Sequence, residues 1–61
     1  MNIDYEKLRN DLIDYFGEGM QYMPVLIMEL SRVGNASNEE LVQIAIKNGF
    51  DLNKYKKYRT I

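Results

Sequence analysis

Hydrophobic side chains recur at helical spacing in the first part of the chain. Five of them fall on one side of a helix with 3.6 residues per turn, and acidic residues gather on an adjacent side. The pattern predicts an amphipathic helix over residues 3–16, capped by Asn2 or Asp4, with Gly17-Glu18-Gly19 interrupting it. The residues on the apolar side are Tyr5, Leu8, Leu12, Tyr15 and Phe16.

The next stretch is apolar around most of its circumference rather than along one stripe. It runs from Met20 to Val33, and Pro24 is compatible with a helix because a proline in the first turn removes no intrahelical hydrogen bond. We therefore expect a second helix over about residues 20–33, with Gly34-Asn35 as its stop. A helix that is apolar on nearly all sides must be covered on most of them. The short helices of one small monomer cover it poorly, so the pattern predicts a partner surface.

Methionines are concentrated in this second helix. An unbranched, polarizable methionine suits a surface that adapts to a partner, and it also fills irregular gaps in an ordinary core. Both interpretations place the second helix at the centre of the molecule. The candidate partner-binding residues are Met20, Met23, Ile27 and Met28.

The third helix has a clear start and a clear stop. Ser37 followed by Glu40 forms a capping box, in which each side chain accepts a hydrogen bond from the other residue's backbone N–H. Gly49 can adopt the left-handed conformation that ends a helix, and Phe50 is then placed to pack back onto the last turn. We expect this helix over residues 38–48.

A short basic helix is predicted at the C-terminal end. Asp51 can cap it, and Leu52 and Tyr55 follow a three-residue spacing that points them inward. We expect it over residues 52–59, with a frayed end. The predicted fold is all-α, a compact bundle of three to four short helices without strands (about 3–16, 20–33, 38–48 and 52–59).

Length and composition limit the ways in which such a fold can be stabilised. A chain of 61 residues has room for one domain, residues 1–61, and a domain this short buries only about 60% of the surface of its unfolded form. Without Cys and His it has neither disulfides nor the usual zinc ligands. Helix packing or oligomerisation must therefore stabilise the fold, and a homodimer is one expectation. No apolar run is long enough to span a membrane and no signal-peptide pattern opens the chain, so we expect a cytoplasmic protein.

Charge is divided unevenly along the chain. Residues 1–40 carry eight acidic and three basic side chains, giving −5, whereas residues 41–61 carry five basic and one acidic, giving +4. One interpretation is that these are solvated faces whose opposite signs help the two halves, or two copies, to associate. The other is a basic tail that contacts nucleic acid or an acidic partner.

The residue types most used in catalysis are missing. Neither His nor Cys is present, and there is no glycine-rich phosphate-binding loop. Asp11 and Asp14 lie side by side on the first helix, but no base or third ligand accompanies them, and we interpret them as surface carboxylates. We therefore expect no enzymatic activity, no cofactor, no metal site and no small-molecule substrate.

One part of the chain resembles the helix-turn-helix pattern of DNA-binding regulators. The match consists of an alanine, a turn glycine four residues later and an apolar anchor six residues beyond it, here Ala45, Gly49 and Tyr55. Asn48 departs from the pattern, which has a small or apolar residue there. The resemblance implies a recognition helix over 51–59 that offers Asn53 to base edges and basic side chains to phosphates. Those basic residues are Lys54, Lys56, Lys57 and Arg59.

A second resemblance covers about a quarter of the chain. The matching segments are similar to those of short, uncharacterised all-helical proteins of bacteria and their phages. This resemblance implies a helical protein of similar size and assigns no activity or binding residue. The segments are Ala36-Ser37, Glu39-Glu40-Leu41, Ile44-Ala45 and Asn48-Gly49-Phe50-Asp51-Leu52.

The patterns together favour one function and leave an alternative. We expect a small helical protein–protein interaction module that acts as a homodimer, or as an adaptor or inhibitor of a larger partner, without catalysis and without a membrane. The alternative is a minimal DNA-binding regulator that uses the basic C-terminal helix. Binding through its Lys and Arg side chains would weaken steeply with salt.

Overall fold

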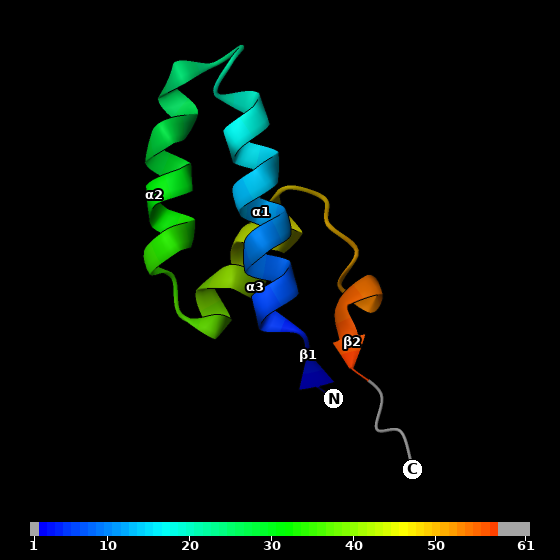
Figure 1. Ribbon diagram of the computed structural model, residues 1–61. Helices are drawn as coiled ribbons and strands as arrows, with labels where there is room; N and C mark the ends of the chain where they lie inside the picture. Colours follow the sequence, from blue (N-terminus) through cyan, green and yellow to red (C-terminus); the bar gives the residue numbers. More distant parts are fainter. Residues whose placement is uncertain (1, 58–61) are drawn as a thin grey trace.

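Two antiparallel helices form a hairpin, and a third helix packs against one half of it (Figure 1). The structure is a computed structural model that describes residues 2–57. Helices α1 (Tyr5–Gly19) and α2 (Ile27–Asn35) make the hairpin, and α3 (Asn38–Lys47) lies behind the half nearer the chain ends. The other elements are short: β1 (Asn2–Ile3), the 3₁₀ helices η1 (Pro24–Leu26) and η2 (Leu52–Tyr55), and β2 (Lys56–Lys57). The predicted all-α fold class is confirmed, but the expectation of no strands is wrong, because β1 and β2 form a short two-stranded sheet.

A single hydrophobic core lies where α1, α2, α3 and η2 meet. Side chains from all four elements are buried in it, and the largest that are completely buried come from α1, α2 and α3. Helices α1, α2 and α3 therefore share one core, and the molecule measures 44 × 18 × 16 Å. The core residues are Leu8, Leu12, Phe16, Val33, Ala36, Leu41, Ile44, Ala45 and Tyr55.

Helix α1 starts two residues later than predicted, because Asn2 and Ile3 form β1, and it also ends later than predicted. The Asp4 side chain caps it by accepting a hydrogen bond of 3.1 Å from the backbone N–H of Lys7. The helix continues through Gly17 to Gly19, so the predicted interruption at Gly17-Glu18-Gly19 is wrong. Glycine costs a helix only about 1 kcal/mol relative to alanine, and the buried Phe16 holds this turn against the core.

The second helix begins later than predicted. Residues before Pro24 form a turn, in which Tyr22 and Met23 both donate backbone hydrogen bonds to the carbonyl of Gly19, and an α-helix starts only at Ile27. A residue before proline avoids the helical conformation because the proline ring would clash with it, and Met23 is indeed non-helical (φ −142°, ψ 85°). The helix predicted over 20–33 is therefore a turn, the 3₁₀ helix η1 and α2.

The start and stop signals of α3 are confirmed. Ser37 and Glu40 form both hydrogen bonds of the capping box, each 3.3 Å long. At the other end Gly49 is left-handed (φ +77°), and the Phe50 N–H donates to the carbonyl of Ala45 over 2.9 Å, which is the Schellman arrangement. The Phe50 ring is half-buried against the core and meets the Tyr15 ring edge-on, with 5.3 Å between centroids.

The C-terminal helix predicted over 52–59 is wrong for the residues described. Asp51 does act as a cap, accepting from the Asn53 N–H over 2.9 Å, but the helix is 3₁₀ and ends at Tyr55. Lys56 and Lys57 then pair antiparallel with Ile3 and Asn2 as a two-stranded ladder. The backbone of Asn2 and Ile3 offers hydrogen-bond partners that a further helical turn would leave unused. Residues 58 and 59 of the predicted helix lie outside the described part of the chain.

Candidate functional site

Five large apolar side chains are more than half exposed at the turn of the hairpin. They occur within seven consecutive positions, on the turn, on η1 and on the first turn of α2, at the end of the molecule that α3 does not cover (Figure 1). We call them the distal patch: Tyr22 (88% exposed), Met23 (57%), Val25 (60%), Ile27 (55%) and Met28 (63%).

The distal patch is exposed because α2 has only one covered side. Val33 is buried, and Leu26 and Leu30 are half-buried against the core, which places these three on the side that faces α1. At 100° per residue Met28 points away from that side. The apolar pattern of this stretch predicts a helix that is covered on most sides, and the chain itself covers one.

The predicted partner-binding residues divide between two environments. Met23, Ile27 and Met28 belong to the distal patch, whereas Met20 is half-buried at the end of α1. Tyr22 and Val25 were not among the predicted site residues. The signal that could have found them is Pro24, since the residue before a proline avoids the helical conformation and a helix is therefore not expected to include Tyr22.

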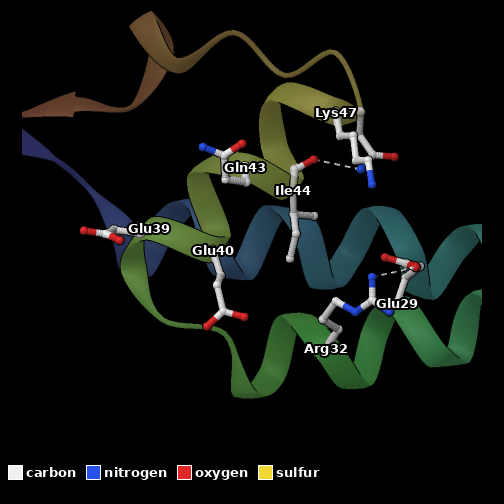
Figure 2. A pocket seen from close by; sticks show the side chains of 8 residues that line it. Glu29, Arg32, Glu39, Glu40, Gln43, Ile44 and Lys47 are labelled. Atoms are coloured by element: carbon white, nitrogen blue, oxygen red, sulfur yellow. Dashed lines mark hydrogen bonds and ion pairs between the residues drawn. The ribbon is translucent and has the colours of Figure 1, made fainter.

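A polar groove lies between α2 and α3, with α1 beneath it (Figure 2). Ile44 points into it from α3, and the Arg32 guanidinium lies 3.4 Å from the Glu29 carboxylate on the α2 side. The Asn48 side chain donates to the carbonyl of Ile44 over 2.8 Å and so caps the end of α3. The groove is lined by Glu29, Arg32, Glu39, Glu40, Gln43, Ile44, Lys47 and Asn48.

The basic residues singled out for nucleic acid do not share a helix. Asn53 and Lys54 are exposed on η2, whereas Lys56 and Lys57 lie on β2. Arg59 lies outside the described residues. Over residues 51–57 the chain therefore lacks the recognition helix that the helix-turn-helix resemblance implies.

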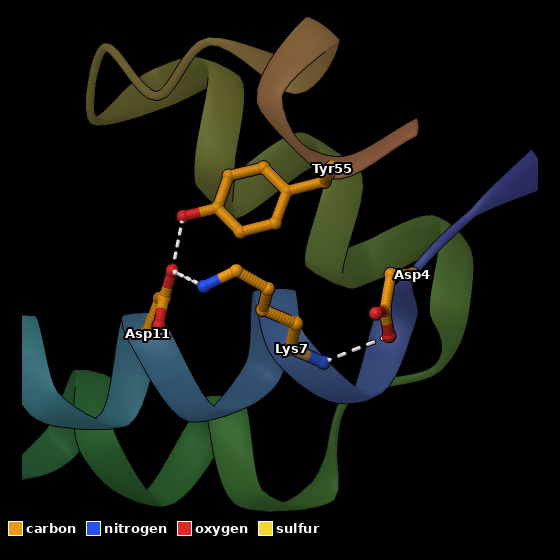
Figure 3. Close-up of polar contacts among 4 residues, drawn as sticks. All are labelled: Asp4, Lys7, Asp11 and Tyr55. Atoms are coloured by element: carbon orange, nitrogen blue, oxygen red, sulfur yellow. Dashed lines mark hydrogen bonds and ion pairs between the residues drawn. The ribbon is translucent and has the colours of Figure 1, made fainter. Parts of the chain in front are cut away.

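Asp11, one of the two paired carboxylates, is engaged in the fold (Figure 3). Its Oδ2 atom accepts a 2.5 Å hydrogen bond from the Tyr55 hydroxyl and lies 3.3 Å from Lys7 Nζ. The Tyr55 bond is the main cause that lowers the pKa of Asp11, burial opposes it, and Lys7 adds to the lowering. Burial, with the Asp11 carboxylate, raises the pKa of Tyr55 to about 12. This arrangement fixes η2 onto α1.

Arg9 caps the end of α2, a role that sequence reasoning missed. Its guanidinium donates to the carbonyl oxygens of Val33 (2.9 Å), Gly34 (3.1 Å) and Ala36 (2.9 Å). Carbonyls at the end of a helix lack the N–H partner four residues later, although the Val33 carbonyl also accepts from the Ala36 N–H over 3.3 Å. A cation at a helix C-terminus also suits the helix dipole. No local signal links Arg9 to residues more than twenty positions later.

Residues 2–57 contain no group of three His, Cys, Asp or Glu side chains placed to hold a metal ion. In the same residues no helix combines the length and the apolar character needed to cross a bilayer. Comparisons with known protein families, curated proteins and solved structures found no match to this chain. The resemblance to short bacterial and phage proteins therefore stays a prediction.

Proposed function

We propose that this protein is a small helical protein–protein interaction module that binds through its distal patch. The observation that carries the proposal is the exposure of five large apolar side chains within seven positions, on a domain whose core lies elsewhere. Apolar residues scattered singly over a surface are ordinary, but a contiguous group of them is typical of an interface.

The composition of the distal patch supports the same proposal. Tyr22, Met23 and Met28 are uncharged and belong to residue types that are enriched at protein interfaces. Methionine in particular adapts its shape to a partner. The patch projects from the core on a two-helix hairpin, so a partner can reach it without displacing α3 (Figure 1).

Site-specific photo-crosslinking tests this function in cells of the source organism. A benzophenone amino acid replaces Met28 in one version of the chain and Ile46 in another. Ile46 is a matched control because it is also apolar and 56% exposed, but it lies on α3 outside the distal patch. We expect a discrete protein adduct from position 28 that position 46 does not give. No adduct at 28, or the same adducts from both positions, would contradict the proposal.

A further inference from the structure

The distal patch has acidic borders. Between Asn10 and Ser31 the chain contains four acidic residues and no Lys or Arg. On one flank Asp14 and Glu18 line a shallow groove with Leu30, one turn from Ile27. On the other flank Glu29, one turn after Val25, begins the groove between α2 and α3.

The acidic borders favour some binding partners of the distal patch over others. Two copies that met patch to patch would bring carboxylates of the same sign together, which opposes association. An anionic lipid surface or a nucleic acid would meet the same repulsion. The basic end of the chain is also a poor complement, because among the described residues of η2 and β2 no large apolar side chain is exposed. A partner that combines apolar anchors with Lys or Arg at their edges fits best.

The shape of the surface indicates a helical partner. Val25, Glu29 and Arg32 follow one another at about one helical turn along α2, so this line leads from the distal patch into the α2–α3 groove. Ile44 lies at the floor of that groove (Figure 2). Its lining holds three carboxylates, Glu29, Glu39 and Glu40, against two cations, Arg32 and Lys47, so the groove keeps an excess of negative charge. An amphipathic helix laid along such a line can place anchors at successive turns against it.

We propose that the distal patch and the adjoining groove bind a basic amphipathic helix of another protein, laid along α2. The inference rests on the proposed function and specifies its partner. Apolar anchors of that helix contact Val25 and Met28. Its Lys or Arg side chains face the Glu18 carboxylate on one flank and, on the other, the Glu29 carboxylate, which they share with Arg32.

The test uses two designed peptides of about 18 residues, long enough to form helix on binding. One has leucines on one face and lysines on the other, and the second has glutamates in place of the lysines. Each carries a fluorescein label, and binding to the full chain is followed by anisotropy. We expect the lysine peptide to bind more tightly than the glutamate peptide by about tenfold or more, with an affinity that falls as salt rises.

Three variants locate the binding. Met28→Lys should lower the affinity for the lysine peptide by about tenfold or more. Ile46→Lys makes the same change of charge outside the patch and should leave that affinity nearly unchanged. The double variant Glu18→Gln, Glu29→Gln should weaken binding and reduce its dependence on salt. Equal losses in Met28→Lys and Ile46→Lys would overturn the inference, because net charge alone would then attract the peptide.

The remaining outcomes separate this inference from the proposed function. Equal affinity for both peptides, lost in Met28→Lys, would leave an interaction surface but overturn its preference for a basic partner. In sedimentation experiments on the protein alone we expect a monomer. A dimer that Met28→Lys abolishes would make a second copy the occupant and overturn the inference, whereas the crosslinking comparison would still support the proposed function.

Discussion

The two ends of the α1–α2 hairpin carry similar apolar side chains in opposite environments. At the end that α3 covers, Leu8, Val33 and Leu41 are completely buried. At the other end Ile27 and Met28 are 55% and 63% exposed. The difference comes from α3 and η2, which pack on one half of the hairpin only (Figure 1). Apolar residues at the covered end therefore hold the fold together, and those at the distal end remain available for contact.

The largest expected effect separates the two ends by stability. Leu41→Ala should lower the free energy of unfolding by about 2–5 kcal/mol, because it removes completely buried methyl groups and leaves a cavity. Ile27→Ala should change it by about 0.5 kcal/mol or less, since most of that side chain stays in water. Urea denaturation of both variants measures this contrast. Similar losses would mean that the distal patch is part of the core.

The Arg9 cap is the next test, since it joins α1 to the end of α2. Arg9→Met should lower stability by about 2 kcal/mol, because the carbonyls of Val33, Gly34 and Ala36 lose a charged donor. Arg32→Met is the control: its partly exposed pair with Glu29 should contribute about 0.5 kcal/mol. If thermal melts show equal changes in the two variants, Arg9 does not act as a cap.

Two glycines give a matched pair of smaller effects with opposite signs. Gly49→Ala should lower stability by about 1–2 kcal/mol because of the left-handed backbone at that position, although a Cβ there would meet no atom within 4 Å. Gly17→Ala should raise stability by about 0.5–1 kcal/mol, since its Cβ also meets nothing and the backbone is helical. A loss in Gly17→Ala on thermal melting would contradict the continuous helix α1.

The smallest effect concerns the hydrogen bond between Tyr55 and Asp11. Tyr55→Phe should lower stability by about 1 kcal/mol near neutral pH. Because folding raises the Tyr55 pKa from 10.0 to about 12, this contribution is complete below pH 10 and is lost as the pH rises toward 12. Folding lowers the pKa of Asp11, so its contribution is present above 3.8 and is lost as the pH falls through the lower folded value.

The measurement for Tyr55 is the difference in urea midpoint between wild type and Tyr55→Phe across the pH range. Residues that titrate equally in both proteins cancel in this difference. We expect the difference to be constant near neutral pH and to narrow at both extremes. A difference that persists unchanged at pH 12 would show that the hydroxyl is not held by Asp11.

The candidate site was only partly predictable, because the spacing of apolar residues carries no information on how the helices pack. The sequence identified Met23, Ile27 and Met28 within a stretch that has more apolar residues than one side of a helix can bury. It could not separate them from Met20, which is half-buried, or find Tyr22 and Val25 as their neighbours. Periodicity reports which side of a helix is apolar, whereas exposure depends on where the other helices run.

The sequence by itself determined the features whose partners lie within a few residues. The Ser37–Glu40 capping box and the Gly49 stop each satisfy backbone groups close by in the chain, so local sequence is enough to predict them. The Asp4 cap is equally local, although the sequence left Asn2 as an alternative.

Only the tertiary structure decided the features whose partners are distant in the chain. These are the Arg9 cap on α2, the bond from Tyr55 to Asp11 and the pairing of β1 with β2, which replaces a predicted helix. Each joins residues more than twenty positions apart, and nothing local signals it. The exposure of the distal patch belongs with them, because it depends on α3 packing against one end of the hairpin and leaving the other uncovered.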